Sequence, residues 1–204
     1  MINPIHEILL ELWWKPSVST GWSVEHCEHT LSTLLKEGMD PNIVFHERGF
    51  YPLWFVHHSG MTLSMVEQLI QYGADVNFES GHCFSPIHRL NGRFLDKAEL
   101  LFQAGAHLHQ LNRQKETVLH SAMREVDKPW IEWLILHGAD IHSVNSSGQT
   151  PLDVIGQSQR IVIPEHANPI QDPESIRKFA IQIYRDYLDT KLPSSEQKPN
   201  IFRL

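Results

Sequence analysis

The chain repeats one short pattern four times within its 204 residues, at intervals of 32 to 35 positions. Each copy consists of two apolar residues, two further positions, and a glycine that opens a short turn. The copies occupy residues 34–42, 69–77, 101–109 and 134–142. A fixed period of this length predicts a stack of similar helical units, each burying its apolar face against its neighbours, and folds of this kind mostly bind partners.

A second pattern recurs in phase with the first. Its copies are residues 51–54, 85–88, 117–120 and 150–153. Three of them begin with a hydroxyl residue, Ser85, Thr117 or Thr150, which can cap the free N–H groups at the start of a helix. Proline often follows, at a position where its missing N–H would have no helical partner. A second helix is then expected to end at the apolar pair, with the glycine in the left-handed conformation.

This order of helix, turn, helix, glycine stop and extended link closely resembles the ankyrin repeat. The family pattern Thr-Pro-Leu-His and Gly-Ala-Asp-Val-Asn is matched best at residues 73–77, at 85–88 and between 117 and 142. The resemblance covers residues 24–157. It implies an all-α fold, an ankyrin-repeat solenoid of stacked helix–turn–helix units with loop or β-hairpin fingers and capping helices.

The chain departs from the family pattern at three positions. Trp54 and Asp153 stand where the family has histidine, and Val118 stands where it has proline. We expect these changes to alter the local geometry of their repeat units and to leave the architecture intact.

A single domain is expected over residues 1–190. Its expected segments are an N-terminal cap at 1–23, the repeats at 24–157, an irregular segment at 158–171 and a C-terminal cap helix at 172–190, followed by a flexible tail at 191–204. Helical spacing of apolar residues predicts helices over 3–14 and over 23–37, the second N-capped by Ser23. The apolar residues of the last helix also follow the helical period.

Composition limits the classes of function. The net charge of −7 argues against non-specific nucleic-acid binding, which needs many cations to neutralise phosphates. The two cysteines, Cys27 and Cys83, do not make a disulfide framework, which favours a reducing compartment. We find no signal peptide and no stretch long enough to span a membrane. The expected location is cytoplasmic, or a host cytosol if the protein is a secreted effector.

Fourteen histidines raise the question of a metal or catalytic site. For His88 and His120, at the family's histidine position, the resemblance implies hydrogen bonds that join the loops of adjacent units. His26, Cys27 and His29 are the nearest approach to a zinc cluster, but a structural zinc site needs four ligands. No phosphate-binding glycine loop or nucleophile elbow is present. We therefore expect no enzyme, no metal and no cofactor.

If the fold is ankyrin-like, the fingers and the exposed side of each first helix would line one concave surface. Aromatic and basic side chains are concentrated at these positions, whereas the acids of the same region lie largely on second helices. The candidate partner-binding residues are Phe50, Phe55, His58, Phe84, Arg89, Arg93, Arg113, Lys115 and Arg124. Val154 is also expected on the exposed side. The alternative is a solvated surface with scattered charges.

The sequence thus predicts a non-catalytic protein–protein interaction module that binds a partner protein with an acidic surface, as an adaptor, an effector or an inhibitor. One alternative is an immunity protein that neutralises a cognate toxin by blocking its active site. A second alternative is a metal-dependent enzyme that uses the histidine-rich regions. We expect no nucleic-acid or membrane partner, and a monomer when the protein is unbound.

Overall fold

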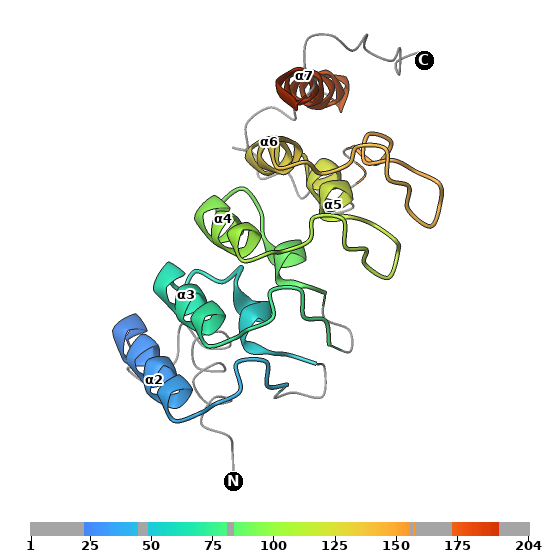
Figure 1. Ribbon diagram of the computed structural model, residues 1–204. Helices are drawn as coiled ribbons and strands as arrows, with labels where there is room; N and C mark the ends of the chain where they lie inside the picture. The colour runs from blue at the N-terminus through green and yellow to red at the C-terminus, as the bar shows by residue number, and fades with distance from the viewer. Residues whose placement is uncertain (1–22, 45–48, 81–83, 156, 158–172, 192–204) are drawn as a thin grey trace, which may run out of the picture. The chain divides into compact units, whose positions relative to one another are not determined.

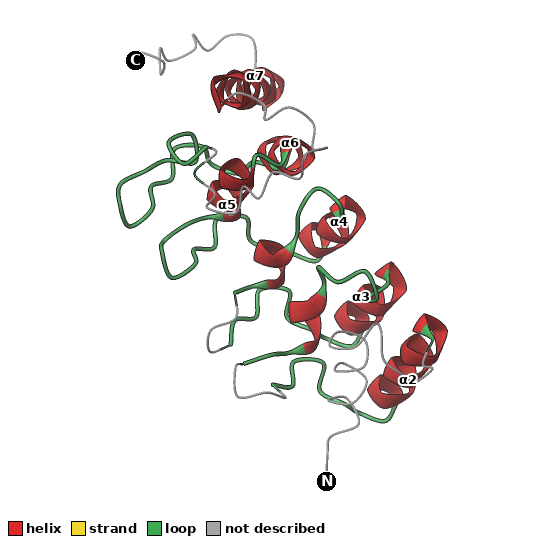
Figure 2. Cartoon of the chain, turned by 180° about the vertical axis from the view of Figure 1, so that it is seen from behind, coloured by secondary structure: helices red, strands yellow, loops and turns green. Residues whose placement is uncertain are grey.

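The computed structural model describes residues 23–44, 49–80, 84–155, 157 and 173–191, and these form two compact parts. We call residues 1–112 the N-terminal part and residues 113–204 the C-terminal part, and describe each by itself. All elements of the described ranges are helices joined by loops, so the expectation of an all-α chain is confirmed at that level (Figure 2). No helix in these ranges combines the length and the apolar character needed to cross a membrane.

The N-terminal part holds three α-helices and two short 3₁₀ helices. They are α2 (Val24–Lys36), η1 (Pro52–Phe55), α3 (Leu63–Gln71), η2 (Pro86–Arg89) and α4 (Leu95–Gln103). Helix α3 packs against both α2 and α4, while η1 packs against η2 and α3 (Figure 1). The second helices of consecutive repeat units therefore lie side by side.

Local sequence explains where these helices begin and which face they bury. The Ser23 hydroxyl accepts a hydrogen bond from the backbone N–H of His26 at 3.2 Å and caps α2, which confirms the helix predicted over 23–37. Thr62 caps α3 in the same way, through the N–H of Met65 at 3.1 Å. In α2 the buried residues recur every four positions, as a helix with one inner face requires. They are Cys27, Leu31 and Leu35.

The first helices of two repeat units are short 3₁₀ helices. The 3₁₀ helices η1 and η2 have four residues each and end at Phe55 and Arg89. The β-branched Val56 follows η1, and Asn91 and Gly92 lie shortly after η2, and these residues have weaker helix propensities than alanine or leucine. His58 and Arg93 therefore lie in turns rather than on a helix face.

The glycine stop behaves as expected in all four copies. Gly38, Gly73, Gly105 and Gly138 have φ between 91° and 95°. After Gly73, the N–H of Ala74 bonds to the carbonyl of Leu69 at 2.9 Å, which is the hydrogen bond of a Schellman motif. Since residues with a Cβ rarely take this conformation, the repeated glycine fixes where each second helix ends.

Asparagine joins one repeat unit to the next in the N-terminal part. The Asn42 side chain donates to the carbonyl of Gly73 at 3.0 Å and accepts from the N–H of Asp75 at 2.7 Å. Asn77 makes the same pair of bonds one unit later, to Gly105 at 2.9 Å and from His107 at 2.8 Å. Each asparagine thus satisfies the backbone of the following turn, where the helix has just ended.

The fingers of consecutive units also touch. Gly49 has φ +84°, and a Cβ at this position would lie 2.5 Å from the carbonyl oxygen of Ser80. The Tyr51 hydroxyl lies 2.7 Å from the carbonyl oxygens of both Phe78 and Phe84. Tyr51 therefore holds the base of the next finger in place.

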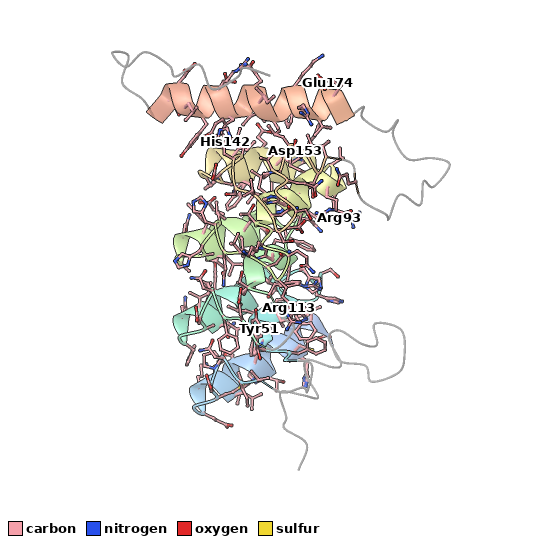
Figure 3. The ribbon with its side chains drawn as sticks, turned by 90° about the vertical axis from the view of Figure 1, so that its right-hand side faces the viewer. Tyr51, Arg93, Arg113, His142, Asp153 and Glu174 are labelled. Carbon is pink, nitrogen blue, oxygen red and sulfur yellow. The ribbon has the colours of Figure 1, made fainter. Side chains whose placement is uncertain are left out.

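The C-terminal part holds α5 (Val118–Glu125), α6 (Lys128–Leu136) and α7 (Pro173–Lys191), with α6 packed against both others. Trp130 and Trp133 are both buried in α6, and their rings stack with centroids 5.1 Å apart. The predicted last helix is also confirmed. His142, beneath α7 in Figure 3, meets the ring of Tyr184 edge to face at 5.7 Å.

In the second pattern, the hydroxyl residue bonds to the side chain three positions later, and at Thr117 it forms a capping box with His120. Thr117 donates through both its N–H and its hydroxyl to Nδ1 of His120, and Nε2 of His120 donates to the carbonyl of Gln149 at 3.1 Å. This bridge to the next unit confirms the role that the resemblance implies for His120. In the last copy, Asp153 accepts the same two bonds from Thr150 at 2.9 and 2.7 Å.

Three predicted segments lie wholly or largely outside the described residues: the cap at 1–23, the irregular segment at 158–171 and the tail at 191–204. One prediction near them is wrong. Val154 is fully buried rather than exposed, because residues 151–155 form turns instead of a first helix and α7 contributes to their surroundings. Arg177 of α7 donates to the carbonyl of Leu152 at 3.0 Å.

We predict that Asn77→Ala lowers the free energy of unfolding by about 1–2 kcal/mol, because two backbone groups of the next turn lose their partner. Urea denaturation followed by circular dichroism measures the effect. Asn77→Asp keeps the acceptor for His107 but places a carboxylate oxygen against the carbonyl of Gly105, so it should also lower the stability. Unchanged stability of both variants would contradict the double role of this side chain.

Candidate functional site

Three of the predicted partner-binding residues gather around one tryptophan in the N-terminal part. Phe50 and Arg89 contact Trp54, Phe55 contacts Phe50, and His57 bonds to Arg89. We call these five residues the Trp54 cluster. Trp54 itself is 9% exposed, whereas the other four members are half-buried and so reach the surface. The cluster is therefore an accessible site with a buried aromatic base.

The aromatic members pack in two different geometries. The rings of Phe50 and Trp54 are nearly parallel, with centroids 6.0 Å apart and 16° between their planes. Phe50 and Phe55 meet edge to face, with centroids 5.6 Å apart at 71°. Both distances lie in the range of favourable aromatic pairs. The two phenylalanines thus extend the apolar surface outward from the tryptophan.

Arg89 is held over this surface from two sides. Its Cζ lies 4.2 Å from the centroid of the Trp54 ring, a cation–π contact. Its Nη2 donates to Nε2 of His57 at 2.9 Å, and Nδ1 of His57 donates to the carbonyl of Trp54 at 3.1 Å. Because His57 accepts at one nitrogen and donates at the other, it is the neutral imidazole with the proton on Nδ1.

The electrostatic surroundings keep His57 neutral. The pKa of His57 is lowered to about 4, mainly by burial and then by the nearby charge of Arg89, while the hydrogen bond to the carbonyl of Trp54 opposes part of the shift. Burial also lowers the pKa of His58, again with help from Lys97. Arg89 is thus the main charge that keeps His57 neutral.

Lys97 of α4 supports the segment that carries His57. It is only 5% exposed, and its Nζ donates to the carbonyls of Val56 at 2.9 Å and His58 at 3.0 Å. The ring of Phe94 lies 4.6 Å from the same nitrogen. Burial lowers the pKa of Lys97. This lysine binds the two carbonyls that flank His57, so it positions the site rather than contacting a ligand.

The remaining predicted residues of the N-terminal part lie apart from this group or on its margin. Phe84 packs near His88, with ring centroids 6.3 Å apart. The His58 ring accepts the N–H of Gly60 at 3.1 Å. Arg93, labelled in Figure 3, is exposed in the turn after η2.

In the C-terminal part, one predicted residue forms an ion pair with a buried acid, and two others are exposed. Arg124 forms a two-pronged ion pair with Glu116, with Nη1 at 3.1 Å from Oε2. Sequence reasoning placed the acids largely on second helices and overlooked Glu116, which lies at the end of a finger and neutralises Arg124. Arg113 and Lys115 are exposed on that finger, and Lys115 has φ +56°.

Sequence reasoning missed Trp54, His57 and Lys97 as members of the site or its support. The signal for Trp54 was present, because it stands where the repeat pattern has histidine and so cannot make the bridge seen at His120. The pattern contains no comparable signal for Lys97, whose side chain is buried on an otherwise ordinary helix.

Comparison with known proteins gives one informative match. No family model matches the chain. A protein of fowlpox virus (strain NVSL) named as an ankyrin repeat protein, FPV024, is 28% identical over 96 residues, which are 46% of this chain and 16% of the viral protein. The chain therefore spans a small fraction of that relative.

In the described residues, no group of three or more histidine, cysteine or acidic side chains could hold a metal ion.

We predict that His57 makes stability fall as the pH is lowered from 6.5 towards 4. The folded state keeps His57 neutral down to about pH 4, whereas the unfolded chain takes up this proton near its ordinary value of 6.5. The loss is about 1–2 kcal/mol after allowance for solvent screening, and it stops below the folded pKa. Urea denaturation across this range measures it. His57→Gln should flatten the profile, and equal slopes for both proteins would refute the assignment.

We further predict that Lys97→Met lowers the free energy of unfolding by about 2 kcal/mol, because two backbone carbonyls lose their donor while the aliphatic volume is kept. The midpoint of urea denaturation measures the change. Lys36→Met is the matched control, since Lys36 is exposed at the end of α2. Equal midpoints for the two variants would contradict a positioning role for Lys97.

Proposed function

We propose that this chain is a non-catalytic protein-interaction module with the stacked arrangement of ankyrin repeats, which binds a partner protein through side chains that differ between its repeat units. The observation that carries this proposal is the Trp54 cluster, an accessible group of aromatic and arginine side chains on a scaffold of repeated backbone links. The proposal includes a cytoplasmic location and a monomeric unbound state.

The separation of scaffold and surface supports a binding role. Asn42, Asn77 and His120 stand at repeated positions, and each bonds to backbone of the following unit. These polar side chains hold units together. The Trp54 cluster stands where the repeat pattern is broken, so its residues serve something other than the common scaffold.

The residue types of the cluster favour a protein partner. Tryptophan, tyrosine and arginine dominate the energetics of protein interfaces, and aromatic residues are enriched there. Phe50 and Phe55 are half-buried on the free protein and can lose their remaining exposure when a partner binds. The name of the viral relative, an ankyrin repeat protein, agrees with this class of function.

The proposed function is tested by capture and identification of a partner. The immobilised chain is incubated with an extract of the cells that produce it, and the bound protein is identified by mass spectrometry and then purified. Phe55→Ala should weaken the purified complex about tenfold or more, because the half-buried ring packs on Phe50 and would lose its remaining exposure to the partner.

Tyr72→Ala is the matched control. Tyr72 is an aromatic residue of the same part of the chain, 43% exposed at the end of α3 and away from the fingers. It should leave the affinity unchanged, and circular dichroism should show that both variants fold. Equal weakening by both variants, or the lack of any protein bound in stoichiometric amount, would contradict the proposal.

A further inference from the structure

We propose that Lys115 holds a glycine position at the expense of stability because its ammonium group binds carboxylates on an acidic surface of the partner protein. This inference rests on the proposed function, since it names a contact that the partner makes with the C-terminal part. Three observations support it: the backbone conformation of Lys115, the bonded residues on either side of it, and the exposed charge of its side chain.

Lys115 stands where two other fingers have glycine. Gly49, Lys115 and Gly148 each lie two residues before a copy of the second repeated pattern. All three have a left-handed backbone, with φ of +84°, +56° and +72°. Glycine adopts this conformation freely, whereas the Cβ of any other residue crowds the backbone. Lysine is therefore the less stable choice at this place in the finger.

The cost of Lys115 lies in its backbone rather than in crowding by other segments. A Cβ added to Gly148, at the equivalent place in the next finger, would meet no atom within 4 Å. Glycine is thus required there only for its left-handed backbone, and the finger has room for a side chain.

The neighbours of Lys115 hold it in this conformation. The carbonyl of Gln114 accepts a hydrogen bond from the N–H of Ser146 on the next finger at 2.9 Å. Glu116 is buried and forms the two-pronged ion pair with Arg124. Since the residues on both sides are bonded to other segments, a change of Lys115 to negative φ would disturb these contacts.

The strain at Lys115 has no evident benefit for the fold. Val126 also has a positive φ, +57°, but it ends α5. There the N–H groups of Val126 and Asp127 bond to the carbonyls of Met123 at 3.2 Å and Ala122 at 3.1 Å. The Lys115 side chain is exposed, and it forms no hydrogen bond or ion pair with the residues that the structure describes. Strained residues of this kind are typical of ligand-binding positions.

The charge of this finger selects an acidic protein surface. Glu116 neutralises Arg124, while Arg113 and Lys115 add two exposed positive charges on the same finger. Carboxylates of a partner complement these charges. A nucleic acid is a poorer match, because it is bound by many cations that follow a chain of phosphates. Charges of this exposed kind act mainly on the rate of association, and salt screens them.

The stability of three variants tests the conformational cost. Lys115→Gly should raise the midpoint of urea denaturation, because the relief of the left-handed backbone exceeds the effect of glycine on the unfolded chain. Lys115→Ala keeps a Cβ and should leave the midpoint unchanged. Gly148→Ala is the reverse control: it adds a Cβ at φ +72° and should lower the midpoint.

Cross-linking tests the contact itself. The chain is incubated with an extract of the cells that produce it, and a water-soluble carbodiimide then joins amines to carboxylates in direct contact, as amides. Mass spectrometry should find an amide between Lys115 and an aspartate or glutamate of the captured partner. Lys178 of α7 is the internal control, since its side chain is 76% exposed in the same part of the chain, and it should carry no amide to the partner.

Association rates with the purified partner complete the test. Lys115→Ala should slow association about threefold at low salt, and this difference should shrink as salt is added. Lys115→Arg should keep the rate, and Lys178→Ala should not change it. Lys115→Gly should associate as slowly as Lys115→Ala while being more stable, a combination that a purely structural role would not produce.

Three results would overturn this inference and leave the proposed function standing. They are partner cross-links at other lysines only, equal association rates for Lys115→Ala and Lys178→Ala, and a midpoint for Lys115→Gly no higher than that of the unchanged protein. If the extract yields no partner at all, the proposed function fails, and this inference fails with it.

Discussion

The hydrogen bonds from Asn42 and Asn77 to the following turn are the interactions on which the N-terminal part depends. Each repeat unit ends its second helix with a glycine, and this leaves backbone groups of the turn without helical partners. The asparagine of the preceding unit supplies both a donor and an acceptor to that turn. The backbone groups that one unit leaves unpaired at its turn are therefore hydrogen-bonded by the asparagine of the preceding unit. This dependence explains why one unit of this length would not be stable alone.

The same logic governs the histidine position and its substitutions. His120 can accept from Thr117 at one ring nitrogen and donate to Gln149 at the other, so it links two units. Asp153 keeps the first half of this bridge and has no proton to donate for the second half. Its bonds to Thr150 lower the pKa of Asp153, with a smaller effect from the charge of Arg177. Trp54 can make neither of these two hydrogen bonds. The hydroxyl of Tyr51 instead bonds to the next finger.

Sequence patterns predicted the features that obey local rules. The capped helix at 23–37, the left-handed glycines and the His120 bridge follow from chemistry within a few residues or from a repeated motif. The lengths of η1 and η2, the burial of Val154 and the pairing of Arg124 with Glu116 depend on packing between segments. The candidate site was predicted in part, since Phe50, Phe55 and Arg89 were named. Their convergence on Trp54 and the support from Lys97 depend on tertiary contacts that the repeat pattern does not encode.

The position of the Trp54 cluster shows how a repeat scaffold can acquire specificity without losing its frame. Replacement of the histidine by tryptophan removes one link between units, and the loss is local, because Asn42 and Asn77 still join the turns. The large ring then provides the base on which Arg89 is oriented. Burying Lys97 beneath the same segment opposes stability, since desolvation disfavours its charge, but its two hydrogen bonds fix the backbone around His57. The unit that carries Trp54 thus lacks one link to its neighbour, and the same ring holds Arg89 at the surface while the other links are kept.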